Sequence, residues 1–240
     1  FDETAVDFLE DLNVPAYKIA SFENTHLPLI KKIASTGKPM IISTGMATIA
    51  DLDETVQTLR DVNCEKFVLL KCTSTYPALP ENSNVLTIPH MRKLFNCEVG
   101  LSDHTMGIGA AVTAVAHGAS VIEKHFTLNN KFLNADHRIS MEPKEFLIMS
   151  KKIKRILEIL GNEKLIPNLA EQKKRYKSHR YIVAKNKIFK GKKISLKDIA
   201  FKRSIKKVQK IKPKEYKKIV GKIAKIDIKV DKILNKNFFH

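Results

Sequence analysis

The first 160 residues repeat one pattern of a short apolar segment rich in β-branched residues, a polar loop and an amphipathic stretch with helical spacing. The apolar segments start roughly 25 residues apart, which is typical of βα units in a parallel sheet. The pattern therefore predicts an α/β fold with about five βα units. The expected strands are residues 16–20, 40–43, 67–71, 98–102 and 121–125.

Helices are expected between these strands and at both ends of the set, and the helix before the last strand closes at Gly118. Five strands do not close an eight-stranded barrel, and the chain begins with Phe1 inside a helical pattern. We therefore expect an N-terminally truncated TIM (β/α)8-type barrel that lacks about three βα units, with an open parallel sheet as the alternative. The expected helices are residues 1–12, 27–34, 49–62, 85–95, 106–118 and 143–160.

The pattern changes after the last expected helix. Residues 162–179 are polar and contain Pro167, so they are predicted to form a linker. From residue 180 onward, short apolar segments alternate with turns such as Lys190-Gly191-Lys192. The chain is thus expected to comprise a part-barrel at 1–161, a linker at 162–179 and a small second domain at 180–240 that is marginally stable alone.

The composition is that of a globular chain, with 43% hydrophobic residues and a mean hydropathy of −0.20. No apolar run reaches the length of a membrane span, and no secretory signal opens the chain. The three cysteines form neither an even set nor a metal-binding spacing. These features favour a protein of the reducing cytoplasm without a membrane partner.

The charge is divided unevenly along the chain, whose net value is +18. Residues 1–150 hold 13 basic and 18 acidic side chains, whereas residues 151–240 hold 30 basic and 7 acidic ones. Such a basic segment raises nucleic acid or an acidic surface as a partner. Few aromatic residues lie among its lysines and no nucleic-acid-binding motif is present, so a solvated lysine-rich surface is the preferred interpretation.

Two expected strands lead directly into a histidine. Gly-Leu-Ser-Asp-His-Thr at 100–105 ends near His104, and Val-Ile-Glu-Lys-His-Phe at 121–126 ends near His125. Parallel strands place their carboxyl ends on one edge of the sheet, so the two imidazoles are expected to converge. They could bind a divalent metal with positions open for substrate, and a pair of hydrogen-bonded loop histidines is the equal alternative.

Polar side chains gather at the carboxyl ends of all five expected strands, the edge where parallel α/β folds bind ligands. Lysines and hydroxyls suit a phosphate or carboxylate, so we expect a small anionic substrate. For Lys18 and Lys124, a salt bridge to Glu23 or Glu123 is the alternative, and Asp136 in the next loop suits either a polar substrate or a turn. The strand-end residues are Lys18, Ser21, Glu23, Ser43, Thr44, Lys71, Thr73, Ser74, Tyr76, Ser102, Asp103, Glu123 and Lys124.

Five motifs, in order, resemble the sialic acid synthase family, and the forms Lys-Ile-Ala-Ser-Phe-Glu and Lys-Cys-Thr-Ser resemble its pseudaminic acid synthase branch. The motifs are Tyr-Lys-Ile-Ala-Ser-Phe-Glu (17–23), Lys-Pro-Met-Ile-Ile-Ser-Thr-Gly-Met (38–46), Lys-Cys-Thr-Ser-Thr-Tyr-Pro (71–77), Gly-Leu-Ser-Asp-His-Thr (100–105) and Glu-Lys-His-Phe-Thr-Leu (123–128). Residues 180–240 are similar to the antifreeze-like (SAF, β-clip-like) domain of the same family.

The resemblance implies a TIM barrel followed by a SAF domain. It also implies that phosphoenolpyruvate condenses with an N-acetylated amino sugar, 6-deoxy-AltdiNAc or a similar one, to give a nine-carbon nonulosonic acid (pseudaminic acid) and phosphate. Residues 136–140, Asp-His-Arg-Ile-Ser, look closer to the neuraminic or legionaminic type, so N-acetylneuraminate and legionaminic acid synthases are the alternative activities. The family's first three barrel strands, with an essential glutamate and a phosphate-binding lysine, have no counterpart here.

The resemblance further implies a role for each strand-end residue. His104 and His125 match the ligands of manganese, with Mg²⁺ or Co²⁺ as alternative ions, and together with Glu23 and Glu123 they form the expected catalytic set. Arg203 matches an arginine that enters the partner's site in a homodimer with exchanged SAF domains, although Ser204-Ile205-Lys206-Lys207 replaces the usual Pro and Gly after it. Phosphoenolpyruvate is expected to contact Lys18, Ser21, Ser43, Ser74, Tyr76 and Ser102, and the sugar Asp136, Lys124 and Arg203.

Our hypothesis is that the metal polarises the aldehyde of the open-chain sugar, so that the enol carbon of phosphoenolpyruvate attacks it. A Schiff-base aldolase that uses Lys18, Lys71 or Lys124 is the rival enzyme class. A basic binding module, or an inactive fragment of a barrel with unpaired strand edges, is the rival outside catalysis.

Overall fold

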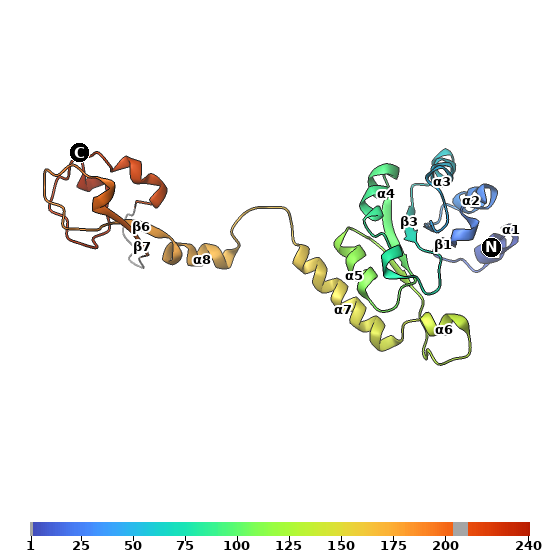
Figure 1. The fold of residues 1–240 in the computed structure, drawn as a ribbon. Helices are drawn as coiled ribbons and strands as arrows, with labels where there is room; N and C mark the ends of the chain where they lie inside the picture. Colours follow the sequence, from blue (N-terminus) through green and yellow to red (C-terminus); the bar gives the residue numbers. More distant parts are fainter. Residues whose placement is uncertain (1, 204–210) are drawn as a thin grey trace. The chain divides into compact units, whose positions relative to one another are not determined.

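Figure 1 shows the computed structural model, which describes residues 2–203 and 211–240. The chain divides into two compact units, Phe1–Asn162 and Glu163–His240. The segment 204–207, for which we predicted an altered loop, lies outside the described residues.

The first unit is built on a five-stranded parallel sheet whose strands follow chain order. Each strand is an apolar, β-branched segment, and neighbouring strands pair in parallel register from end to end. The five predicted strands are therefore confirmed, with ends that shift by at most one residue. They are β1 (Tyr17–Ile19), β2 (Met40–Ser43), β3 (Phe67–Cys72), β4 (Glu98–Asp103) and β5 (Ile122–Lys124).

Helices connect these strands, and local signals explain their ends. In the third helix, Thr48 and Asp51 form a reciprocal capping box at the start. Pro143 occupies the first turn of the seventh, where its missing N–H is not needed. The six predicted helices are present as α1 (Glu3–Asp11), α2 (Leu27–Ala34), α3 (Ile49–Asp61), α4 (Thr87–Phe95), α5 (Gly109–Ala116) and α7 (Pro143–Leu160), and short 3₁₀ turns η1 (Ser21–Glu23) and η2 (Pro80–Asn82) follow β1 and β3.

Two helices were not predicted. The first, α6 (Ala135–Ile139), lies in the loop after β5 and begins at Asn134, whose side chain accepts from the Asp136 N–H. The second, α8 (Leu169–Ser178), lies inside the segment predicted as a linker and begins with a capping box between Asn168 and Glu171. The polar composition of 162–179 concealed this helix, because it has no apolar face to reveal its period.

The core of the first unit lies between the sheet and the helices that cover it, with α1 beside α2 and α2 beside α3 (Figure 1). Ile42, Leu69 and Val99 from the middle strands pack there against Ile30 and Leu59 from the helices, all essentially inaccessible to solvent. Because side chains alternate across a strand, the residues between these core positions face the opposite side of the sheet. That second face carries Lys18, Ser43, Ser102 and Glu123 of the polar strand-end residues, whereas Asp103 and Lys124 lie on the core side.

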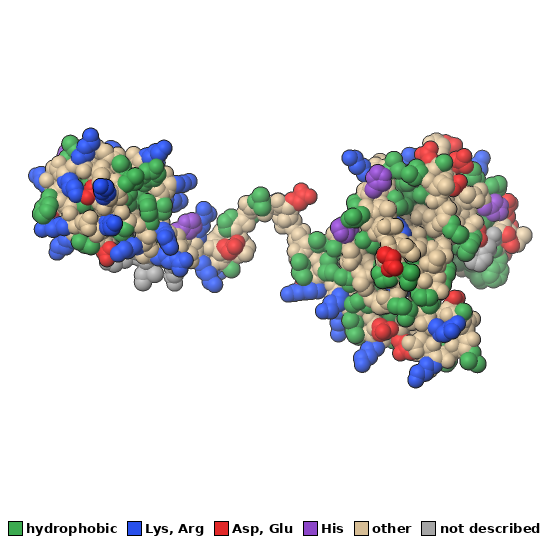
Figure 2. All heavy atoms as spheres, in the orientation of Figure 1, with side chains coloured by type: hydrophobic (Ala, Val, Ile, Leu, Met, Phe, Trp, Pro, Cys, Tyr) green, Lys and Arg blue, Asp and Glu red, His purple; other side chains and the backbone are tan. Residues whose placement is uncertain are grey.

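The second unit has its own core and short antiparallel pairings. Strands β6 (Arg180–Ala184) and β7 (Ile199–Arg203) pair antiparallel. The 3₁₀ turn η3 (Leu196–Asp198) lies between them in the chain, and η4 (Pro213–Lys218) and η5 (Lys236–Phe238) follow β7. Isoleucines supply most of the core, which includes Ile188, Ile194 and Ile228. Lysine and arginine side chains cover much of the face shown in Figure 2, as the charge distribution in the sequence requires.

Across residues 2–203 and 211–240, we find no helix that combines the length and the apolar character needed to cross a bilayer.

The close packing around Gly100, the second interior position of β4, predicts that an added methyl group destabilises the fold. A Cβ there would lie 2.4 Å from the Val121 carbonyl oxygen and 2.7 Å from a Leu70 methyl. Gly100→Ala should therefore lower the free energy of unfolding by about 1–3 kcal/mol in thermal or urea denaturation. Gly109→Ala is the control, because Gly109 is helical and has no atom within 4 Å of the added Cβ. Equal stability of the two variants would contradict this packing.

Candidate active site

The inner face of the sheet collects one polar side chain from the carboxyl end of each strand. Strand alternation places these side chains opposite the core residues, and the loops that follow β4 and β5 add His104 and His125. The five side chains are those of Lys18, Ser43, Cys72, Ser102 and Glu123.

The Lys18 ammonium joins the two edge strands of the sheet. It donates to Ser43 Oγ at 2.7 Å and lies 3.7 Å from Glu123 Oε1, which also accepts from Ser102 Oγ at 2.7 Å. Lys18 belongs to β1 and Glu123 to β5, with three strands between them. These side chains meet only because the sheet curls, so the structure is a part-barrel rather than the open sheet that spacing allowed. It also confirms the salt bridge to Glu123 that we weighed for Lys18.

The Lys18 ammonium is partly desolvated, although its side chain is still 35% exposed. Burial lowers the pKa of its ammonium, and the nearby Glu123 carboxylate opposes that shift only in part. A partly buried ammonium with a single weak carboxylate contact retains capacity for a further anion.

Gly45 lies two residues after the end of β2, next to the side chains of Ser21, Cys72 and Ser74, and we call the space between these residues the cradle. A Cβ at this position would lie 2.1 Å from Ser74 Oγ, 2.7 Å from Ser21 Oγ and 3.2 Å from Cys72 Sγ. The Gly45 N–H donates to Ser21 Oγ at 3.1 Å. Two serine hydroxyls and the Cys72 sulfur thus surround a point that only glycine leaves open, and the two hydroxyls can donate to a phosphate or carboxylate.

His104 and His125 converge as predicted, with ring centroids 5.2 Å apart. The Tyr76 ring lies against both, with its centroid 4.3 Å from that of His104 and 5.7 Å from that of His125. His104 Nδ1 is 3.0 Å from the Thr73 carbonyl oxygen. Because a carbonyl only accepts, Nδ1 must carry the proton, and Nε2 presents its lone pair to the space beside His125.

The donor set fits a divalent metal. With metal–nitrogen bonds of ~2.1 Å, two imidazoles on one ion have ring centroids about 5 Å apart. The carbonyl of Thr73 supplies the outer hydrogen bond that metal-bound histidines usually make. Burial, then the neighbouring His104, lowers the pKa of His125 and keeps it neutral, the form that binds metal. Within the described parts of the chain, no third His, Cys, Asp or Glu completes a cluster, so the remaining positions fall to water, substrate or other segments.

Cys72 connects the cradle to the histidine pair. Its Sγ lies 3.5 Å from Ser21 Oγ, 3.6 Å from Ser74 Oγ and 3.9 Å from His104 Nδ1. Burial raises the pKa of the thiol, but the hydrogen bonds from His104, Ser21 and Ser74 outweigh burial and lower it to about 7. For His104, burial acts against protonation, and the contacts with Cys72 and Thr73 outweigh it and raise the pKa.

Glu23 borders a hollow of about 350 Å³ between α1, β1 and α2. Apolar side chains such as Val6, Leu9 and Ile33 line most of it, together with Lys18. Glu23 Oε2 is buried and lacks a hydrogen-bond partner among the described residues. A carboxylate oxygen in this condition requires a partner that the described chain does not supply.

Three predicted site residues lie elsewhere. Lys124 is buried in an ion pair with Asp103, so the glutamate partner that we weighed for it is wrong, and its ammonium is not open to a sugar in this arrangement. Asp136 is exposed on α6, close enough to His125 that its charge opposes the lowering of the His125 pKa. Arg203 belongs to the second unit, opposite Arg180 in the β6–β7 register, and its entry into a partner's site stays a prediction.

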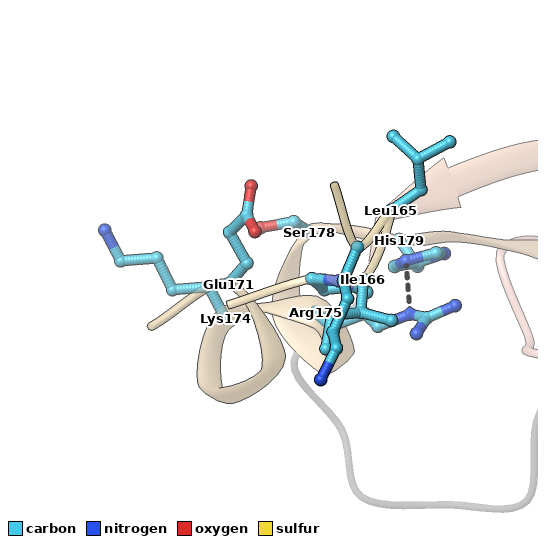
Figure 3. Close-up of a pocket in the computed structure, with 9 residues that line it drawn as sticks. Leu165, Ile166, Glu171, Lys174, Arg175, Ser178 and His179 are labelled. Carbon is cyan, nitrogen blue, oxygen red and sulfur yellow. Dashed lines mark hydrogen bonds between the residues drawn. The ribbon is translucent and has the colours of Figure 1, made fainter. Parts of the chain in front are cut away.

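A separate hollow of about 750 Å³ lies in the second unit between residues 164–167 and α8. Figure 3 shows the Arg175 guanidinium beside the His179 ring, to which Arg175 Nε donates at 3.3 Å. None of the predicted site residues lines this hollow. The concentration of donors and carboxylates places the candidate site at the sheet edge instead.

Gly45, Cys72 and the backbone of Thr73 were not predicted as site components. Gly45 and Cys72 stand inside two of the quoted motifs. The signal that was available is strand alternation, which puts Cys72, and not Lys71, on the same face as Ser43 and Ser102.

The hydrogen bonds to Cys72 predict a thiolate near neutral pH. In the metal-free protein, the 240 nm absorbance of one thiolate should appear as pH rises through about 7, since a lowered pKa favours the ionised form above it. Cys72→Ser should remove this step. Cys64 and Cys97 serve as internal controls, because burial raises the pKa of both thiols. A Cys72 titration at or above the ordinary thiol range would contradict the hydrogen-bonded arrangement.

Three relatives each align with most of the chain. It is 36% identical over 236 residues to the N,N'-diacetyllegionaminic acid synthase of Campylobacter jejuni, with 98% of this chain and 70% of that protein aligned. It is 38% identical over 226 residues to the pseudaminic acid synthase of Helicobacter pylori, with 93% and 65% aligned. An uncharacterized protein of Methanocaldococcus jannaschii is 45% identical over 198 residues, which are 82% of this chain and 59% of that protein. The chain thus spans only part of the length of these three relatives, between 59% and 70%.

A solved structure and two family matches agree with the fold. The N-acetylneuraminic acid (sialic acid) synthetase of Leptospira borgpetersenii superimposes with a TM-score of 0.69 at 33% identity, covering 73% of this chain and 61% of that one. Residues 1–165 match the NeuB family and residues 179–239 match the SAF domain. The sequence resemblance is thereby confirmed: the chain belongs to the NeuB family and carries a SAF domain C-terminal to its part-barrel.

Proposed function

We propose that this chain carries the carboxyl-end portion of the active site of a phosphoenolpyruvate-dependent nonulosonic acid synthase. One observation carries the proposal. Cys72 Sγ contacts Ser21 and Ser74 of the cradle and also the His104 ring, so the proposed anion site and the proposed metal site are adjacent. Condensation of an anionic enol with an aldehyde needs these two functions side by side.

The cradle and Lys18 bind phosphoenolpyruvate. The hydroxyls of Ser21 and Ser74 hold one anionic group in the space that Gly45 leaves open, and the Lys18 ammonium holds the other from its position between Ser43 and Glu123. Phosphoenolpyruvate has a phosphate and a carboxylate at opposite sides of its enol, which matches two neighbouring anion subsites.

His104 and His125 would hold the divalent ion, for which we propose Mn²⁺. Such an ion supplies Lewis-acid polarisation of the sugar aldehyde. Tyr76 packs on both imidazoles and limits their rotation. Its ring also forms an apolar wall beside the space where the open-chain sugar lies, with Asp136 as the polar contact from α6.

In the proposed reaction, the enol carbon of phosphoenolpyruvate forms a bond to the aldehyde carbon, whose oxygen takes up a proton. Water then adds to the carbon that bears the phosphate, and loss of phosphate leaves a nine-carbon 2-keto acid. Glu23, with its unpartnered oxygen near Lys18, is the described residue suited to accept the proton from that water. Glu123, fixed by Ser102 and Lys18, keeps the ammonium oriented toward the enol substrate.

The sugar that we assign is the pseudaminic acid precursor, 6-deoxy-AltdiNAc, on the basis of the motifs at 17–23 and 71–77. The legionaminic and pseudaminic acid synthases match this chain almost equally, so their substrates are the direct competitors in the assay. We further propose that the protein works in the cytoplasm as a homodimer with exchanged SAF domains, which brings Arg203 to the partner's sugar.

Activity of the complete gene product tests the function. The assay contains phosphoenolpyruvate, Mn²⁺ and, in turn, the amino-sugar precursor of pseudaminic, legionaminic or N-acetylneuraminic acid. We expect phosphate release and a nine-carbon keto acid that mass spectrometry detects, and the fastest reaction with 6-deoxy-AltdiNAc, the pseudaminic acid precursor. His125→Ala should lose Mn²⁺ binding and lower kcat/KM by about 100-fold or more. His90→Ala, an exposed histidine on α4, is the matched control. Full activity in chelator, or equal activity of both variants, would overturn the proposal.

Borohydride trapping separates the synthase from a Schiff-base aldolase. The lowered pKa of Lys18 would also suit an amine nucleophile, so the experiment is informative. We expect no covalent adduct when the protein is reduced in the presence of substrates, because the Lys18 ammonium is engaged with Ser43 and Glu123. Mass spectrometry of tryptic peptides gives the answer. An adduct on Lys18 that Lys18→Met abolishes would establish the aldolase instead.

A further inference from the structure

The most completely buried ion pair among the described residues stands directly behind the histidine pair. Lys124 Nζ lies 2.8 Å from Asp103 Oδ2, and the two side chains are 2% and 1% exposed. Asp103 immediately precedes His104, and Lys124 immediately precedes His125. The two charged residues therefore occupy equivalent positions before the two candidate metal ligands.

Hydrogen bonds extend the ion pair to both sides of His104. Asp103 Oδ1 accepts from the Thr105 N–H at 2.8 Å and from Thr105 Oγ1 at 2.7 Å. Lys124 Nζ also donates to the Thr105 carbonyl oxygen at 2.6 Å. The backbone that carries His104 is thus held at the residue before it and at the residue after it, and the Lys124 side chain completes both links.

The ion pair is the last direct link between β4 and β5 before the histidines. Asp103 and Lys124 form the final pair of the β4–β5 register. Beyond it the two backbones part, because the His104 carbonyl accepts from Ala78 and the His125 carbonyl accepts from Met141. Alternation directs Asp103 and Lys124 away from the face that bears His104 and His125.

A buried ion pair is a poor means of stabilising a fold, since desolvation offsets most of its Coulomb energy. Apolar side chains of similar size would pack the same space without that cost. What the pair adds is a fixed geometry: its hydrogen bonds define one separation between the strand ends, and so between the histidines.

We propose that Asp103 and Lys124 are positioning residues that set the separation of His104 and His125 and thereby the affinity of the site for a divalent cation. The inference rests on the proposed function, which assigns the metal to these histidines. It predicts that loss of the pair weakens metal binding without loss of the fold.

The test is Mn²⁺ binding to the complete protein, followed by the electron paramagnetic resonance signal of the free ion. The double variant Asp103→Asn with Lys124→Met keeps the two hydrogen bonds that residue 103 accepts from Thr105 and the approximate volume of both side chains, but it removes the charges, the bridge and the Lys124 donor to the Thr105 carbonyl oxygen. We expect Mn²⁺ affinity about tenfold lower, a change of the size that loss of outer contacts to metal ligands causes. KM for phosphoenolpyruvate should stay unchanged and saturating Mn²⁺ should restore kcat, which general destabilisation would not produce.

The matched control is Glu10→Gln with Lys38→Met. It removes another Lys–carboxylate pair, in which Lys38 Nζ lies 2.8 Å from Glu10 Oε1, near the C-terminal end of α1 and just before β2. It should leave Mn²⁺ affinity at the wild-type value. Should the first double variant fail to fold, Lys124→Arg keeps the charge and displaces the donor, and weaker Mn²⁺ binding at wild-type thermal stability gives the same support.

Two results would overturn the inference, and they are distinguishable. Wild-type protein that binds Mn²⁺ through His125, together with equal affinity in the charge-free or Lys124→Arg variant, rejects the positioning role and leaves the proposed function intact. Wild-type protein whose Mn²⁺ binding is absent or unaffected by His125→Ala rejects the metal site and the positioning role together.

Discussion

The contact of Lys18 with Glu123 is the constraint on which the site depends. These side chains come from the two edges of the five-stranded sheet, and they meet only when the sheet curls. The curl also brings Ser43 and Ser102 to either side of the same ammonium–carboxylate contact. Because the chemistry needs groups from several strands within one substrate's length, the curvature of the backbone is the first requirement of the site.

Strand alternation divides the polar strand ends into two sets with different surroundings. Lys18, Ser43 and Glu123 face the interior, where they remain available to an anion. Asp103 and Lys124 face the helices, where they are sealed from solvent and pair with each other. Charged residues of one chemical type are therefore either open to the interior or sealed from solvent, according to which side of the pleat they occupy.

Much of this could be predicted from the sequence. The strands, their parallel order and the convergence of His104 and His125 follow from apolar periodicity and from the rule that parallel strands share a carboxyl edge. The partner of Lys124 was predicted wrongly because sequence neighbours were preferred to the register partner, Asp103. The cradle at Gly45 could not be foreseen in detail, since the approach of Ser21 and Ser74 to its Cα is a tertiary contact between three loops. Helix α8 was missed because its capping signal stands in a segment without apolar period.

The central claim is that the anion cradle and the histidine pair form one site, joined through Cys72. The direct measurement is the ³¹P relaxation of phosphoenolpyruvate bound to the complete protein, with Mn²⁺ or with diamagnetic Mg²⁺ present. One shared site places the phosphorus within roughly 10 Å of the ion, because the cradle and the His104 ring touch the same sulfur. Strong Mn²⁺-dependent relaxation is the result expected. Relaxation that is the same with Mn²⁺ and Mg²⁺, while both ligands are bound, would contradict a shared site.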